Sequence, residues 1–439
     1  MIPSFYLILT CLVIGIVLIV ILTTRMKLHP FFALLLASLV VGCGVGLPVT
    51  DVLNTVKEGF GNIMRSLALI IVLGTALGIV LEKTGCTQVM ASFLFRKLGK
   101  HPALAMSITG YTVGMPLFCD SGFIVLSGLN RSFAAKTGTP VVVMAIAMAT
   151  GLYSVHCLIP PHPGAAAAAT TIGVDFGRLI LFGLLIALPV MFVGNLFARY
   201  RGRKFAQASD SELKLEEIET RGPGVVAAFL PVIVPVILIA TRSFLPAGLE
   251  NPILKILSVA GDPVAALSVG LLLAIATVKK IERKSIAQWL QEGAEKAGGI
   301  LVIIGMGGGF GAVLNATHIG QHFSTELPLT GMGLLFPFLL TALLKTAQGS
   351  STVAIITAAS IVQPLLVTLG FVTPDQKLLC VLSMGAGSMM ISHANDAYFW
   401  VISRFEKIDL KPMLQVYSMA SVLMGITAFL FTCLLSMIL

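Results

Sequence analysis

Polar residues interrupt apolar sequence at two places with similar chemistry. Serine and threonine hydroxyls bind carboxylate and polyol oxygens, and a helix that begins after such residues points unpaired N–H groups and a positive dipole end at an anion. The residues are Asp120, Ser121 and Gly122 in the stretch LFCDSGFIVL, and Gly349, Ser350, Ser351 and Thr352 in AQGSSTVAII. We expect helices that begin near Phe123 and near Thr352 to bind a small polar anion at their N-termini.

Two further polar clusters lie in apolar sequence, and each could bind a carboxylate. His162 lies in PPHPG, while His393, Asn395 and Asp396 lie in SHAND. Lys345 precedes the second serine-rich stretch, where a buried cation would attract an anion. A coupled proton could be carried by Asp120, by Asp396 or by His393, because ionisable groups within a membrane are usually functional.

Each of these residues also has a structural interpretation. Asp120 could only cap a helix that begins at Phe123, and Ser350 and Ser351 could bond the local backbone. The histidines and Asn395 could satisfy carbonyl groups freed at helix breaks. Lys345 could snorkel or pair with a carboxylate. The sequence leaves these alternatives open.

The elements that position these residues must lie in a membrane. Of the 439 residues, 56% are hydrophobic and 11% are charged, whereas a soluble domain carries about 25% charged residues. Apolar runs of roughly 20 residues, the length that crosses a bilayer core, recur along the chain. They include Ser4–Thr23, Phe31–Val49, Ser66–Leu81, Arg178–Ala198, Val225–Ala240 and Pro412–Leu439. The sequence therefore predicts an all-α polytopic membrane protein.

Composition also excludes several classes of partner and cofactor. The net charge of +9 comes from basic clusters at 25–27, 96–100, 199–204, 279–284 and 404–411, which are typical of cytoplasmic loops rather than of nucleic-acid binding. The seven cysteines lack metal-ligand spacing. The glycine-rich run at 306–311 lies in an apolar span without the lysine of a P-loop, so we expect its glycines to permit close helix packing. We predict no metal and no cofactor.

The second half of the chain repeats the first at a distance of about 230 positions. Five ordered matches near one offset are not expected by chance, so we predict two copies of one unit, 1–200 and 224–439, joined by a cytoplasmic linker at 201–223. The matches are His29-Pro30 with Asp262-Pro263, VKEG (56–59) with LQEG (290–293), GIVL (78–81) with GAVL (311–314), Ser121 with Ser351, and His162 with His393.

Basic clusters place the N-terminus outside the cytoplasm. Each unit then has about five crossings and one re-entrant hairpin, at 101–136 and at 334–370. An odd number of crossings inverts the second copy, so both termini lie outside. Four breaks fall at matched positions, 119–122, 159–164, 348–351 and 392–396. Paired broken helices in inverted repeats are typical of secondary transporters that bind substrate near the membrane midplane.

The motifs resemble those of the gluconate permease family, GntP type. They are LFxDxGF (117–123), PPHPG (160–164), GDP (261–263), GSxTVA (349–354) and SHxND with FW (392–400), and the likeness covers essentially the whole chain. The resemblance implies a homodimer of the ion-transporter superfamily that works by an elevator movement in the bacterial inner membrane, with periplasmic termini. It favours as site residues Asp120, His162, Gly349, Ser350, Thr352, His393, Asn395 and Asp396.

The resemblance further implies import of gluconate or a related sugar acid by proton symport. On this basis 1–62 and 224–296 are assigned to scaffold helices, and 63–200 and 297–439 to a transport part. Two departures from the family pattern, Cys119-Asp120-Ser121 and Lys345 in place of an arginine, leave hexuronate, glycerate and D-serine open as substrates. The alternatives are a sodium-coupled carboxylate carrier, a membrane-embedded hydrolase that uses His162 or His393, and a passive channel.

Overall fold

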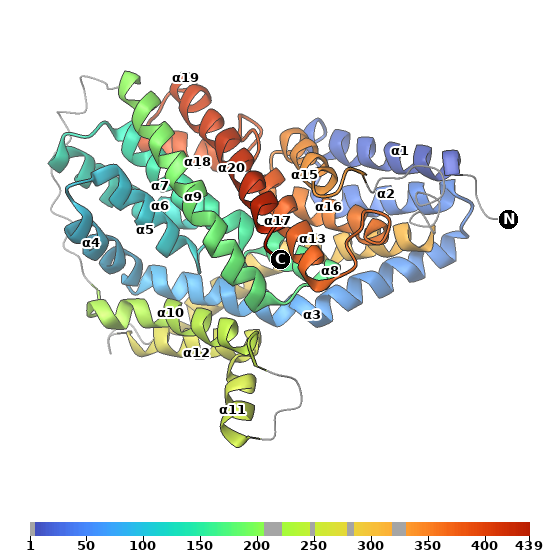
Figure 1. Cartoon of the computed structure of the whole chain (residues 1–439), viewed down its shortest axis with the longest axis horizontal. Helices are drawn as coiled ribbons and strands as arrows, with labels where there is room; N and C mark the ends of the chain where they lie inside the picture. Colours follow the sequence, from blue (N-terminus) through green and yellow to red (C-terminus); the bar gives the residue numbers. More distant parts are fainter. Residues whose placement is uncertain (1–4, 206–221, 246–250, 279–284, 318–330) are drawn as a thin grey trace.

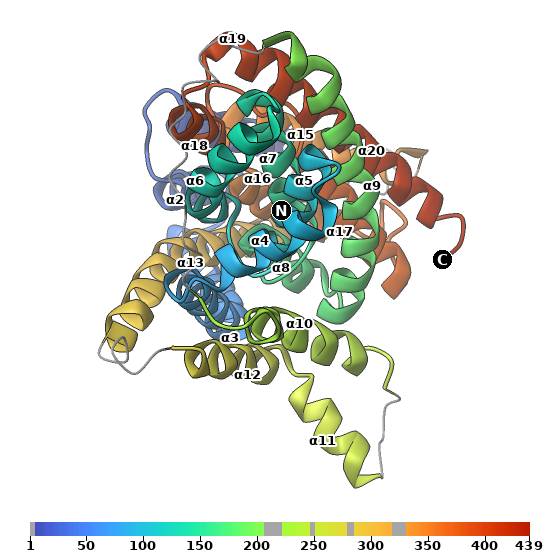
Figure 2. The ribbon, with the colours of Figure 1, turned by 90° about the vertical axis from the view of Figure 1, so that its left-hand side faces the viewer.

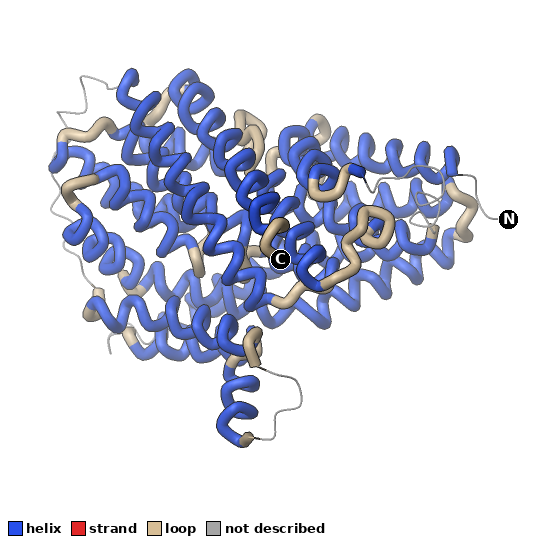
Figure 3. The backbone as a smooth tube through the Cα atoms, viewed as in Figure 1, coloured by secondary structure: helices blue, strands red, loops and turns tan. Residues whose placement is uncertain are grey.

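The computed structural model describes residues 5–205, 222–245, 251–278, 285–317 and 331–439. These ranges form helices joined by loops and turns (Figure 3). Within them, seven helices are long and apolar enough to cross a membrane, or eight if one bent pair counts as a single span. The prediction of an all-helical polytopic membrane protein is confirmed.

The first four helices are α1 (Phe5–Thr24), α2 (Pro30–Gly44), α3 (Val49–Lys83) and α4 (Cys86–Leu98). The prediction that the third span begins at Ser66 is wrong, because α3 begins at Val49. Its early turns bury Val52, Val56 and Ile63 at helical spacing, while polar residues such as Lys57 are exposed. This polar face lowers the mean hydropathy of 49–65, so an apolar run alone does not reveal the start of the helix.

The next helices are α5 (Pro102–Gly114), α6 (Cys119–Thr137), α7 (Val141–Leu158), α8 (Pro163–Ile172) and α9 (Phe176–Gly202). The break expected at 159–164 is present, since α7 ends at Leu158 and α8 begins at Pro163. The break expected at 119–122 lies earlier, between Gly114 and Cys119. Pro116 has no N–H group to continue α5, and the Gly122 N–H already donates to the Phe118 carbonyl at 2.8 Å.

Asp120 therefore lies within the first turn of α6, and the N-cap position belongs to Phe118. Asp120 does not cap a helix that begins at Phe123. A carboxylate in the first turn still interacts favourably with the positive end of the helix dipole.

The second half contains α10 (Val225–Arg242), α11 (Pro252–Ala260), α12 (Pro263–Ala276), α13 (Ile286–Ala316), α15 (Leu335–Gln348), α16 (Ser351–Val362), α17 (Pro374–Ser388), α18 (Ala397–Glu406) and α20 (Met419–Leu435). The chain is broken between α15 and α16 and between α17 and α18, close to both expected positions. Helix α16 begins at Ser351, one residue before the expected Thr352. Most of the expected linker and the basic cluster at 279–284 lie outside the described residues.

The long helix α3 lies along the longest dimension of the molecule (Figure 1). Helices α10 and α12 lie side by side on one side of α3, and the group that contains α5, α7 and α9 lies on the other (Figures 1 and 2). Helix α11 bends away from α12 by 73° and extends from the body. The folded chain thus places α3 between two groups of helices.

Glycines bring α13 into close contact with its neighbours. A Cβ atom on Gly59 of α3 would lie 2.5 Å from the Gly308 carbonyl oxygen, and one on Gly307 would lie 2.2 Å from Ile356 of α16. A side chain at Gly59 would require the backbone to shift, and one at Gly307 would require the Ile356 side chain to move. The predicted packing role of the glycine-rich run at 306–311 is confirmed.

Candidate functional site

A cavity of about 370 Å³ lies where the breaks of the two halves meet. The N-terminal ends of α6, α16 and α18 reach it, together with α7 and α13. Eight of the predicted site residues line it, namely Asp120, Ser121, Gly349, Ser350, Ser351, Thr352, Asn395 and Asp396. Segments that are far apart in sequence therefore form one polar cavity, as expected for broken helices that face each other across protein rather than lipid.

Two helix N-termini supply hydrogen-bond donors to this cavity. Gly122 is the first residue of α6 whose N–H donates within the helix, and the corresponding residue of α16 is Ala354, which donates to Ser350. Ser350 is the N-cap of α16, and its hydroxyl accepts from the Val353 N–H at 3.3 Å. The remaining first-turn N–H groups have no partner within their helices. The two ends together favour an anion.

Asp120 lines the cavity without a strong partner. Its carboxylate accepts only a weak contact from the Cys119 thiol, with 3.6 Å between Sγ and Oδ1. The structure gives it no ion pair within the described ranges. A carboxylate in this position retains its capacity to bind a proton or a substrate group.

Asp396 also lines the cavity, but its oxygens are already bonded. Oδ2 accepts from Lys345 Nζ at 2.6 Å and from the Ser392 hydroxyl, while Oδ1 accepts from the Tyr398 N–H at 3.0 Å as the N-cap of α18. Lys345 is fully buried and also donates to the Gly349 carbonyl. The lysine ties the end of α15 to the start of α18 and does not reach the cavity wall.

His393 and Asn395 close the C-terminal end of α15. His393 Nε2 lies 3.2 Å from the Thr346 carbonyl oxygen, and the Asn395 amide donates to the Thr346 and Ala347 carbonyls at 2.8 and 3.2 Å. These carbonyls have no partner within the helix. Gly349 has φ +83°, and a Cβ there would lie 2.1 Å from the Asn395 carbonyl oxygen. Only glycine fits at this contact.

His162 is buried away from the cavity. Its Nε2 bonds the Gly114 carbonyl at 2.8 Å, at the end of α5, and its Nδ1 lies 3.3 Å from Nδ1 of His156. His156 is the histidine that lines the cavity. His156 was not predicted as a site residue, although an ionisable residue inside an apolar span is by itself an indication of function.

The structure thus separates the predicted site residues into two groups. Gly122, His162, Lys345 and His393 are absent from the cavity lining. Gly122 packs on α7, because a Cβ there would lie 2.8 Å from Leu152. The lining residues that were not predicted include Phe118, Tyr153, His156, Gln348 and Tyr398.

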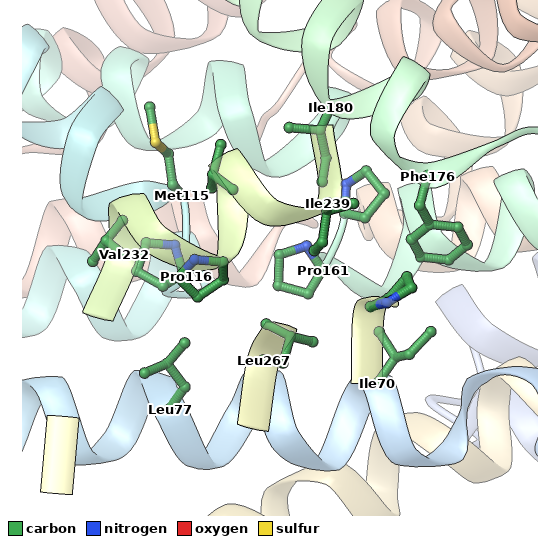
Figure 4. A pocket seen from close by; sticks show the side chains of 14 residues that line it. Ile70, Leu77, Met115, Pro116, Pro161, Phe176, Ile180, Val232, Ile239 and Leu267 are labelled. Atoms are coloured by element: carbon green, nitrogen blue, oxygen red, sulfur yellow. The ribbon is translucent and has the colours of Figure 1, made fainter. Parts of the chain in front are cut away.

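A second, much smaller cavity of about 30 Å³ is lined by apolar residues and prolines. Met115 and Pro116 from the first break and Pro161 from the second approach Val232 of α10 and Leu267 of α12 (Figure 4). Its lining contains no charged side chain. At this cavity, the contact between α10–α12 and the two breaks is therefore an apolar seam.

Membrane-length helices and a polar cavity framed by broken helices define a multi-pass membrane protein of the transporter class. The chain matches the family model described as GntP family permease over residues 7–438. It belongs to the GntP permease family, and the resemblance seen in its motifs is confirmed.

Named relatives agree with this assignment, and a solved structure shares the fold. The chain is 32% identical to a gluconate permease of Pseudomonas aeruginosa, over 99% of this chain and 98% of the relative. It is 31% identical to the D-serine transporter DsdX of Escherichia coli, over 97% and 98%. The structure of Neisseria gonorrhoeae MtrF is similar with a TM-score of 0.63 at 17% identity, over 93% of this chain and 96% of that one. The last similarity concerns the fold alone.

Proposed function

We propose that this protein imports gluconate or a related small hydroxy-carboxylate by proton symport. The names of its relatives, a gluconate permease and a D-serine transporter, share a carboxylate and at least one hydroxyl group as the chemistry of the cargo. The cavity offers helix N-termini for the carboxylate and hydroxyls from Ser121, Ser351 and Thr352. Its volume of about 370 Å³ is in the range of small-molecule sites.

Asp120 is the proposed carrier of the coupled proton. The observation that carries this proposal is that Asp120 lines the cavity without an ion pair among the described residues, whereas Asp396 is bonded to Lys345 at 2.6 Å. An anionic substrate beside an ionised Asp120 would be repelled. Binding of a proton to Asp120 removes that repulsion and couples the two cargoes.

Uptake into proteoliposomes tests the proposal. We expect wild-type protein to accumulate gluconate when a pH gradient is imposed without sodium, and Asp120→Asn to lose accumulation while it still exchanges internal for external gluconate. Asp51→Asn is the matched control, because Asp51 is also an aspartate in the first turn of a helix but is exposed and absent from the cavity lining. Accumulation by Asp120→Asn equal to that of the control would remove Asp120 from this role.

A sodium-coupled carrier is the second candidate. The hydroxyls of Ser121, Ser350 and Thr352 line the same cavity, and hydroxyl and carbonyl oxygens are sodium ligands in broken-helix transporters. The same vesicles separate the two candidates. Accumulation that requires a sodium gradient and ignores the pH gradient would favour sodium.

The larger architecture is part of the proposal. We propose two inverted repeats, 1–200 and 224–439, that work by an elevator movement in a homodimer in the bacterial inner membrane, with both termini in the periplasm. The matched order of α5–α6 with α15–α16 and of α7–α8 with α17–α18 supports the repeats. Exposed apolar side chains on α10 and α12, such as Ile237 and Leu272, suit a membrane-embedded dimer contact or lipid.

The apolar seam supports a sliding contact between the scaffold, 1–62 and 224–296, and the transport part, 63–200 and 297–439. The boundaries at 62 and 296 fall inside the continuous helices α3 and α13, so the sliding proposed at this seam is against α10 and α12, which lie wholly within the scaffold. A cysteine pair at Met115 and Leu267, introduced into a cysteine-free chain, tests the movement. Mercury bridging of this pair should stop transport and leave gluconate binding intact; transport that continues after complete bridging would argue against sliding at this seam.

A further inference from the structure

We infer that His156 recognises a hydroxyl or amino group of the substrate through a hydrogen bond accepted at Nε2, so that the cavity selects hydroxylated or aminated acids over plain carboxylates. This inference rests on the proposed function, because it assigns substrate selectivity to the same cavity. It follows from the tautomers of two adjacent histidines.

The tautomer of His162 is set by a backbone carbonyl. Its Nε2 lies 2.8 Å from the Gly114 carbonyl oxygen, and a carbonyl can only accept, so this nitrogen carries the proton. A neutral imidazole has one N–H donor and one bare nitrogen. The Nδ1 of His162 is therefore an acceptor.

His162 in turn sets the tautomer of His156. The two Nδ1 atoms are 3.3 Å apart, and because that of His162 accepts, that of His156 must donate. The one ring proton of a neutral His156 is then on Nδ1, which leaves Nε2 as a bare acceptor. A histidine that lies outside the cavity thus decides which kind of hydrogen bond the cavity can offer.

The bare nitrogen belongs to a ring that lines the cavity. His156 is 9% exposed, and its Nε2 has no hydrogen-bond partner within the described ranges. Tyr153 stacks against the ring at a centroid distance of 6.4 Å, and Phe118 meets it edge-on at the same distance. These contacts hold the imidazole, so the direction of its acceptor is fixed before the substrate binds.

An acceptor in this position distinguishes one part of the substrate from another. A carboxylate has no proton to donate, so it binds the helix N-termini and hydroxyl groups rather than Nε2. Substrate hydroxyl and ammonium groups do donate, and they fit Nε2 and Asp120. A site built to bond a hydroxyl group discriminates strongly against an analogue that lacks it, because the polar group of the site then stays unpaired.

Equilibrium binding to the purified full chain tests the inference, with gluconate, its set of single-deoxy analogues and hexanoate as probes. We expect wild-type protein to bind at least one deoxy analogue about tenfold or more weakly than gluconate. His156→Phe should bind gluconate about as weakly as the wild-type protein binds that analogue. The variant should also bind gluconate and the analogue with about equal affinity.

Two further variants separate recognition from folding. His156→Gln keeps an acceptor near the Nε2 position and should recover part of the preference for gluconate. His162→Gln can still donate to Gly114 and accept from His156, so it should keep the preference, whereas His162→Phe, which releases the tautomer of His156, should reduce it. His162 is in this sense a positioning residue, and the readout is the ratio of affinities rather than affinity alone.

Three results would decide against parts of this reasoning. If the wild-type protein binds gluconate and every deoxy analogue equally well, the inference is overturned and the proposed function stands. This measurement needs no variant. Equal weakening of gluconate and of all analogues by His156→Phe also overturns the inference. Wild-type protein that binds none of the acids, with D-serine included in the panel, overturns the proposed function and the inference with it.

Discussion

Replacement of Lys345 by methionine should destabilise the protein strongly, because Lys345 is a buried cation with two bonds across a helix break. Its Nζ donates to Asp396 at 2.6 Å and to the Gly349 carbonyl, and none of its side chain is exposed. Methionine preserves the length and most of the volume of the apolar stem. The change therefore removes the charge and both hydrogen bonds with little loss of packing.

The expected cost is about 3–5 kcal/mol of unfolding free energy, the cost of leaving the partner of a buried ion pair uncompensated. Asp396 would keep only its bonds from Ser392 and from the Tyr398 N–H. Asp396→Asn should cost a similar amount, since it leaves the ammonium group unpaired. The double variant lacks both charges, so its cost should fall short of the sum by about 2–3 kcal/mol, a coupling typical of contacting residues.

Equilibrium unfolding in mixed detergent micelles measures this cycle, and Arg242 provides the matched control. Arg242 and Asp262 are also 2.6 Å apart, but their side chains are 41% and 44% exposed. Arg242→Met should therefore cost no more than about 1 kcal/mol. Equal destabilisation by Lys345→Met and Arg242→Met, or additive effects of the two changes at the Lys345–Asp396 pair, would refute the reasoning.

Two further predictions concern the ends of the helices that frame the cavity. Gly349→Ala should abolish gluconate binding and lower the unfolding temperature, because the added Cβ would lie 2.1 Å from the Asn395 carbonyl oxygen. Gly370→Ala is the control: Gly370 has a similar φ of +81° but lies in open space, so the change should cost only about 1–2 kcal/mol of backbone strain. Glu406→Ala should destabilise the contact of α6 with α18 by about 3 kcal/mol, since the buried carboxylate accepts from the Asn130 amide at 3.0 Å and lies 3.5 Å from Arg131 Nε. Glu406→Gln keeps the packing and an acceptor for Asn130, so it should cost clearly less in the same unfolding assay. Equal costs would assign the loss to the charge, which both variants remove, and not to the bond with Asn130.

The sequence predicts the parts of this fold that depend on local pattern. Apolar runs locate most of the spans, and PPHPG and GSST locate two breaks to within a few residues. The start of α6 could have been predicted from Pro116, because proline ends a helix through its missing N–H. The prediction rested on the polar residues at 119–122, which lie in the first turn of α6, and therefore placed the break too late.

Contacts between distant segments could not be predicted in the same way. Lys345 and Asp396 meet only because α15 ends against the segment before α18, and His393 and Asn395 reach the carbonyls of α15 for the same reason. A sequence shows that such groups need partners in a membrane but not which partners they find. Residue type therefore identified the polar breaks, and tertiary placement decided which residues line the cavity.

Asp120, at the break before α6, and Asp396, at the break before α18, have different partners, and this difference predicts how substrate binding depends on pH. Lys345 neutralises Asp396, whereas Asp120 has no such partner among the described residues. Gluconate stays ionised between about pH 6 and pH 8, so its charge does not change while that of Asp120 can. If one proton must bind before the anion, the affinity for gluconate falls as pH rises, by up to about tenfold per unit for a single proton.

Asp120→Asn should make that affinity nearly independent of pH in the same range, because the asparagine is neutral throughout, and Asp51→Asn should retain the wild-type slope. Isothermal titration of gluconate at several pH values measures both slopes. A slope that survives in Asp120→Asn would move the proton to another group of the cavity, and His156 would be the first to test. A flat wild-type profile would contradict proton coupling at the binding step and favour the sodium-coupled alternative.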